Sequence, residues 1–112
     1  MLAEVADEYL EDVFYSPFML YTFKVKPEKK NRIAAVVHKD GTTRPQMVTR
    51  DVNPVYYETI KLFGEKTGVP VVLNTSFNVK GEPIVDSLID AIKCFYGTGL
   101  DVLVLNNFLL KK

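Results

Sequence analysis

The sequence predicts an α+β fold in which helices pack on a mixed, mainly antiparallel twisted sheet. Three observations support this class. The composition, 47% hydrophobic and 25% charged, is that of an ordinary globular protein. Apolar residues recur at helical spacing in three segments, and short runs of β-branched and aromatic residues lie between them. Because 112 residues is the length of one typical domain, we expect residues 1–112 to form a single domain.

Two elements are predicted before residue 26. Apolar residues form a stripe from Leu2 to Phe14, which indicates a helix that Ser16 and Pro17 interrupt. Phe18 to Val25 is apolar at nearly every position, which predicts a strand buried on both faces. The charged run from Lys26 to Arg32 predicts a solvated turn or short helix.

A hairpin is predicted next. Ile33 to Val37 and Thr43 to Thr49 flank Asp40 and Gly41, and these two residues tolerate the positive φ of a tight turn. Pro45 cannot donate a ladder hydrogen bond, so the second strand is expected to be an edge strand or to be bulged there.

The middle of the chain predicts a helix, a strand and a loop. Asn53 is a favourable N-cap before a helix from Pro54 to Thr67, and Gly68 is a typical C-terminal stop. Val69 to Leu73 is wholly apolar and predicts an interior strand. The aperiodic stretch from Asn74 to Pro83 predicts a loop.

A helix and a hairpin are predicted at the C-terminus. Asp86 is expected to cap a helix that runs towards Tyr96. Its predicted core residues are Leu88, Ile89, Ile92 and Phe95. Val102 to Leu105 and Phe108 to Leu110 are expected to pair across Asn106 and Asn107, which accept left-handed backbone.

Charge, hydropathy and cysteine content exclude several function classes. Fourteen basic residues balance fourteen acidic ones, so we expect no nucleic-acid partner. The longest apolar runs have five residues, against the ~18 that a membrane span needs, so we expect no membrane association. Cys94, the sole cysteine, cannot form an intrachain disulfide, which fits a cytoplasmic protein. With a single histidine, His38, a structural zinc site is excluded and no metal site is expected.

The spacing of Cys94 and His38 leaves a nucleophile pair open, although a thiol in mid-helix favours a buried, inert side chain.

The loop after the predicted interior strand is the first candidate site. Ser76 and Asn78 are two residues apart, so in extended backbone their side chains point the same way. A hydroxyl and an amide can together hold a phosphate oxygen, a hydrated metal or a carbonyl. The alternative is a turn in which both side chains satisfy the backbone. Lys80 could neutralise phosphate charge or simply be solvated.

The second candidate site follows the predicted hairpin turn. Arg44 precedes Pro45, which restricts its backbone, and its guanidinium could clamp a phosphate or carboxylate. The alternative is an ordinary exposed arginine, and His38 alone is typical of a surface or core position. We predict that Arg44, Asn74, Ser76 and Asn78 converge on one polar pocket.

Taken together, the two segments resemble a known family. The residues concerned are His38-x-Asp40-Gly41-Thr42-Thr43-Arg44, with Gln46, Val48 to Arg50 and Asn53-Pro54 beyond, and the block Asn74-Thr75-Ser76-Phe77-Asn78-Val79-Lys80-Gly81-Glu82-Pro83. The resemblance is to the C-terminal domain of the O-carbamoyltransferases, which include nodulation-factor and antibiotic carbamoyltransferases, and it extends over essentially the whole chain.

The resemblance implies a YrdC-like fold and an activation reaction. ATP, as its Mg²⁺ complex, and carbamoyl phosphate would yield carbamoyl-adenylate, and a separate N-terminal transferase domain would pass the carbamoyl group to an acceptor hydroxyl. Ser76 and Asn78 match the Ser-x-Asn pair of YrdC-like sites, and together with Arg44 they are the expected catalytic residues. The expected substrate- and nucleotide-binding residues are Asn74, Lys80, His38 and Arg50.

The same resemblance implies that the chain is the C-terminal part of a longer enzyme. The family's basic segment, expected to supply a Lys-x-Arg pair, precedes the matching region. We therefore expect the isolated chain to be inactive and to self-associate into a homo-oligomer through exposed apolar surface. The alternative function is a non-catalytic module that binds nucleotide or docks a neighbouring domain. Threonylcarbamoyl-adenylate synthesis is a related enzymatic alternative.

Overall fold

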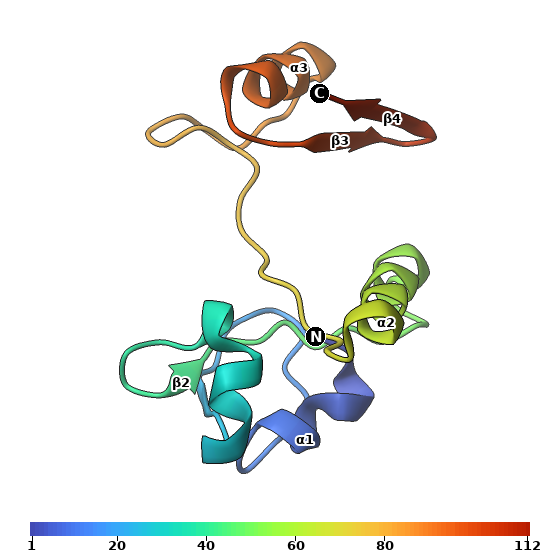
Figure 1. Ribbon diagram of the computed structural model, residues 1–112. Coiled ribbons are helices and arrows are strands. Elements are labelled where there is room, and N and C mark those ends of the chain that lie inside the picture. Colours follow the sequence, from blue (N-terminus) through green and yellow to red (C-terminus); the bar gives the residue numbers. More distant parts are fainter. The chain divides into compact units, whose positions relative to one another are not determined.

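A computed structural model describes all 112 residues, which fall into two compact units, Met1–Leu73 and Asn74–Lys112 (Figure 1). Helices and short antiparallel sheets occur in the same chain, which confirms the predicted α+β class. In place of one larger sheet there are two separate two-stranded antiparallel sheets, one in each unit. None of the helices combines the length and apolar character needed to cross a bilayer.

The N-terminal helix is shorter than the sequence predicts. A 3₁₀ turn, η1 (Ala3–Val5), leads into α1 (Ala6–Tyr9), and the next residue, Leu10, is already extended. The predicted helix as far as Phe14 is therefore wrong. The helix ends early because its next backbone groups pair with a distant segment. The Tyr9 carbonyl accepts from the N–H of Lys26 at 2.9 Å, and Leu10 forms an antiparallel bridge with Val25.

The first sheet pairs different segments from those predicted. Strand β1 (Phe23–Lys24) pairs antiparallel with β2 (Thr42–Thr43), with Phe23 opposite Thr43. Ile33 to Val37 is not a strand, because η3 (Ala34–Val36) occupies it. The run from Phe18 to Val25 is not buried on both faces either, since Phe18 is 73% exposed. The predicted short helix is confirmed as η2 (Pro27–Arg32).

Helix α2 (Pro54–Thr67) is confirmed with both of its predicted ends. The Asn53 side chain accepts a hydrogen bond from the N–H of Tyr56 at 3.1 Å, as an N-cap should. Gly68 ends the helix in the left-handed conformation at φ 74°, where a side chain would be strained. Ile60 is the fully buried residue of the helix.

The segment from Val69 to Leu73 is not the predicted interior strand. It belongs to no strand, and Leu73 is 65% exposed. Val69 and Val71 instead pack against the larger of the two core clusters of the first unit. The two clusters have these buried members: Met1, Ala6, Tyr9, Leu10, Phe23, Val25, Ile33 and Met47 in one, and Leu2, Val48 and Ile60 in the other.

The second unit contains a helix and a hairpin. Helix α3 (Leu88–Gly97) begins one residue later than predicted, because the hydroxyl of Ser87, not Asp86, accepts from the N–H of Asp90 at 3.1 Å. The predicted hairpin is confirmed: β3 (Val102–Leu105) pairs with β4 (Phe108–Lys111).

The core of the second unit differs in part from the predicted one. Phe95 is completely buried, as predicted, and packs with Ala91 and Leu103. Leu88 and Ile89, predicted to be core residues, are more than 60% exposed. They lie in the first turn of α3, ahead of Ala91 and Phe95, the residues of this helix that pack with Leu103. Cys94 is buried, which agrees with the prediction for its position.

Candidate functional site

A tight turn from His38 to Thr42 forms the base of the second candidate site, the one that follows the predicted hairpin turn. The N–H of His38 donates to the carbonyl of Thr42 at 2.7 Å, and the N–H of Gly41 donates to the carbonyl of His38 at 2.9 Å. Gly41 has φ 81°, a conformation that residues with a β-carbon rarely adopt. The predicted turn is therefore present, although the strand that β2 pairs with is β1.

Three side chains of this turn form a connected chain of hydrogen bonds. The Asp40 carboxylate accepts from the backbone N–H of Thr42 at 3.0 Å and from the Thr42 hydroxyl at 2.7 Å. The same hydroxyl oxygen lies 3.1 Å from Nδ1 of His38. The hydrogen bonds from Thr42 lower the pKa of the Asp40 carboxyl below its ordinary value, with a smaller contribution from the charge of His38. Asp40 is thus held as an ionised acceptor at neutral pH.

Basic side chains surround this turn. Lys24 lies directly opposite Thr42 in the sheet register and is exposed, so both residues share the outer face. The side chain of Lys30 lies against Gly41: its Nζ is 2.6 Å from the position that a β-carbon of residue 41 would occupy. Arg44 is exposed while the preceding Thr43 is buried, which puts Arg44 on the outer side as well. The outer side of this turn can therefore attract an anion.

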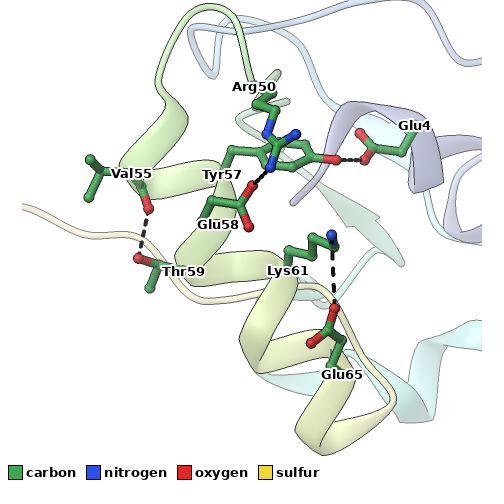
Figure 2. Close-up of polar contacts among 8 residues, drawn as sticks. All are labelled: Glu4, Arg50, Val55, Tyr57, Glu58, Thr59, Lys61 and Glu65. Carbon is green, nitrogen blue, oxygen red and sulfur yellow. Dashed lines mark hydrogen bonds and ion pairs between the residues drawn. The ribbon is translucent and has the colours of Figure 1, made fainter.

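Arg50 is engaged by neighbouring side chains of the first unit. Figure 2 shows its guanidinium at the Glu58 carboxylate, next to the ring of Tyr57, whose hydroxyl donates to Glu4. The guanidinium carbon lies 5.9 Å from the centre of the Tyr57 ring. The hydrogen bond to Glu4 raises the pKa of the Tyr57 hydroxyl above its ordinary value. Both partners of the ion pair are exposed, so the pair contributes little to stability.

The first candidate site, the loop that contains Ser76 and Asn78, lies in the second unit. The side-chain amide of Asn78 donates to the carbonyl of Glu82 at 2.9 Å, and the N–H of Glu82 donates to the carbonyl of Val79 at 3.0 Å. The N–H of Val85 closes the loop by donating to the carbonyl of Phe77 at 2.9 Å. These contacts give Asn78 the backbone-satisfying role that the sequence left open. Its side-chain oxygen is free of those donor contacts and can still accept a hydrogen bond.

The remaining residues of the loop present exposed polar side chains. Asn74, Ser76 and Lys80 are all exposed. They belong to the second unit, and Arg44, His38 and Arg50 belong to the first. The predicted convergence of Arg44 with Asn74, Ser76 and Asn78 on one pocket therefore remains a prediction.

A groove of about 260 Å³ in the first unit contains none of the candidate residues. Apolar side chains such as Val36, Phe63 and Val69 line most of it, and Arg32 is the charged residue of the lining. Such a lining does not suit a phosphate. No group of three or more histidine, cysteine, aspartate or glutamate side chains gathers to hold a metal ion.

The geometry also identifies residues that the site prediction passed over. Thr42 contacts His38, and Asp40 in turn contacts Thr42. Of this turn and the residues next to it, only His38, as a binding residue, and Arg44, as a catalytic residue, were predicted to belong to the site. The signal was present in the sequence as the spacing His38-x-Asp40-Gly41-Thr42. Spacing alone does not tell which hydroxyl hydrogen points to which oxygen.

Comparison with known proteins identifies relatives over the whole chain. The family described as "Carbamoyltransferase C-terminus" matches residues 1–112. An uncharacterized protein of Methanocaldococcus jannaschii is 46% identical over 112 residues, which are 100% of this chain and 22% of that protein. The nodulation protein NolNO of Sinorhizobium fredii is 50% identical over 96 residues, which are 86% of this chain and 14% of that protein.

A third relative is named for its enzymatic activity. The 3'-hydroxymethylcephem-O-carbamoyltransferase of Streptomyces clavuligerus is 34% identical over 80 residues, which are 71% of this chain and 15% of that enzyme. The chain therefore spans less than a quarter of the length of each of these relatives.

Proposed function

The chain belongs to the carbamoyltransferase C-terminal family, and on that basis we propose that it is the part of an O-carbamoyltransferase that forms carbamoyl-adenylate. It would bind ATP and carbamoyl phosphate, and a transferase domain elsewhere in the protein would pass the carbamoyl group to an acceptor hydroxyl. The observation that carries the proposal is the family match over all 112 residues. A relative named as a cephem O-carbamoyltransferase supports the reaction class.

The proposed reaction balances in two steps. Water cleaves carbamoyl phosphate to carbamate and inorganic phosphate. A carbamate oxygen then attacks the α-phosphorus of ATP, forming a new P–O bond as the bond to pyrophosphate breaks. The products are carbamoyl-adenylate and pyrophosphate. Catalysis of such a step consists mostly of positioning the reactants and stabilising negative charge.

The residues of the first unit suit the anionic part of this chemistry. Arg44 is exposed and follows the turn from His38 to Thr42, and its guanidinium can donate two parallel hydrogen bonds to a phosphoryl group. Lys24 and Lys30 add positive charge on the same turn. In the second unit, Ser76 can donate to a phosphoryl or carbonyl oxygen, the side-chain oxygen of Asn78 can accept, and Lys80 can supply charge. Mg²⁺ would arrive as the ATP complex, since the protein residues do not form a cluster of metal ligands.

Pyrophosphate release tests the proposal. A full-length protein carrying this chain as its C-terminal region should release pyrophosphate only when ATP and carbamoyl phosphate are both present. Ser76→Ala should slow that release without changing stability, because Ser76 is exposed. Release with ATP alone would contradict the proposal. Nucleotide binding without any release would favour the non-catalytic module instead.

A further inference from the structure

The hydrogen-bond chain at the turn of the first unit determines which nitrogen of the neutral His38 ring carries the hydrogen. The Thr42 hydroxyl has a single hydrogen, and the Asp40 carboxylate, 2.7 Å away, can only accept. That hydrogen therefore points to Asp40. The contact of 3.1 Å between Thr42 Oγ1 and His38 Nδ1 then needs a hydrogen on Nδ1.

In the neutral ring, this assignment leaves the lone pair on Nε2. A neutral imidazole carries one N–H, and Nδ1 has it here, so Nε2 is a hydrogen-bond acceptor. His38 is exposed, and its Nδ1 side is held by Thr42, so Nε2 is the ring atom that can meet a ligand. The backbone bonds of the same turn, at 2.7 Å and 2.9 Å, hold the main chain of His38.

The basic side chains around this turn are hydrogen-bond donors, whereas Nε2 of His38 is a hydrogen-bond acceptor. Lys24, Lys30 and Arg44 all donate, and each suits a phosphoryl or carbonyl oxygen. None of them can recognise an N–H group. The carbamoyl group differs from an acetyl group in that an NH₂ replaces the methyl, and that NH₂ needs an acceptor. The acceptor side chains of this turn are the Asp40 carboxylate, whose Oδ1 already accepts two hydrogen bonds from Thr42, and Nε2 of His38.

We propose that His38 Nε2 accepts a hydrogen bond from the NH₂ of the carbamoyl group, and that Thr42 and Asp40 are positioning residues which hold the ring for that role. This assignment rests on the proposed function and adds the selection of carbamoyl phosphate over other acyl phosphates. A net hydrogen bond of about 1 kcal/mol corresponds to a preference of roughly fivefold for the compound with the amide.

The first test is the tautomer of His38, read by long-range ¹H–¹⁵N NMR. His38 is the sole histidine, so the spectrum has no overlap. The neutral ring should carry its hydrogen on Nδ1, and Thr42→Val should shift it to Nε2. Thr59→Val is the matched control, because the Thr59 hydroxyl donates to the carbonyl of Val55 on α2, away from the turn. A wild-type ring protonated at Nε2, or a ring unchanged by Thr42→Val, would overturn the proposal.

The second test titrates the chain with phosphonoacetamide and with acetonylphosphonate, which has a methyl group in place of the NH₂. Both should shift the Arg44 side-chain resonance, and only the amide should shift Nε2 of His38. Equal effects on His38, or a response of Arg44 without one of His38, would overturn this inference and leave the proposed function standing. If neither residue responds to either compound, both the inference and the proposed binding by this turn are wrong.

Discussion

Lowering the pH from 9 to 5 should destabilise the 112-residue chain through the amino group of Met1. Met1 is 6% exposed, and its amino nitrogen donates to the carbonyl of Gln46 at 3.0 Å. Burial lowers the pKa of this group from 8.0 to about 6. The buried group thus resists protonation, whereas the unfolded chain takes up a proton below pH 8.

The sign and the size follow from those two values. Above pH 8 the amino group is neutral in both states and costs nothing. As the pH falls from 8 to 6, the unfolded state binds more protons, and stability falls by about 3 kcal/mol in total. Below pH 6 this contribution is constant.

Urea unfolding at several pH values, with and without N-terminal acetylation, isolates the contribution. Acetylation removes the titrating amine and leaves every other ionisable group in place, so the difference between the two stability curves reports Met1 alone. That difference should change by about 3 kcal/mol between pH 9 and pH 5. A difference that stays constant with pH would refute the reasoning, because it would mean that Met1 is solvated in the folded chain.

Three further predictions concern packing and caps. Ile60→Ala should cost about 2–5 kcal/mol in chemical denaturation, because Ile60 is completely buried, while Leu62→Ala on the same helix, 53% exposed, should cost under about 1 kcal/mol; equal losses would contradict the described core. Ser87→Ala should cost about 1 kcal/mol by removing the cap of α3, and Ser76→Ala should be nearly neutral in the same melt; a neutral Ser87→Ala would contradict the cap. Val104 and Leu109 face each other across the β3–β4 hairpin, and both are more than 60% exposed. Val104→Lys should therefore weaken the self-association of the chain, measured by light scattering. A wild-type chain that stays strictly monomeric at high concentration would contradict that expectation.

Local signals predicted the elements that local contacts determine. Asn53 and Gly68 mark the ends of α2. The hydrogen bonds at both ends join near neighbours, since Asn53 accepts from Tyr56 and Gly68 donates to Gly64. Asn106 has φ 52° and lets β3 and β4 pair across a two-residue turn, which the sequence also indicated. In each case the partner of a residue is its near neighbour in the chain.

Long-range pairing accounts for the elements that were predicted wrongly. The turn at Gly41 was recognised, but β2 pairs with Phe23 and Lys24, about 20 residues earlier, and not with the adjacent run. Leu10 fits the helical stripe, yet its bridge to Val25 ends α1. Nothing in the local pattern of either segment states which distant strand it will meet.

The candidate site could likewise be predicted only in part from the sequence. The sequence identified the two polar segments, and the family match supports their reaction class. The sequence did not show that the side chain of Asn78 donates to the carbonyl of Glu82, or that the guanidinium of Arg50 pairs with Glu58. Those contacts depend on side-chain positions that spacing does not encode.

The most direct test of the central claim is mass spectrometry of the nucleotide product formed from ATP and ¹³C-labelled carbamoyl phosphate without an acceptor. A full-length protein carrying this chain should yield ¹³C-carbamoyl-adenylate and pyrophosphate. Arg44→Gln should lower the rate of adenylate formation, because it should remove about 2–4 kcal/mol of transition-state stabilisation. Lys39→Gln, which removes a neighbouring exposed charge, should leave it nearly unchanged. Formation of ADP in place of the labelled adenylate would contradict the account, because it would show phosphoryl rather than adenylyl transfer.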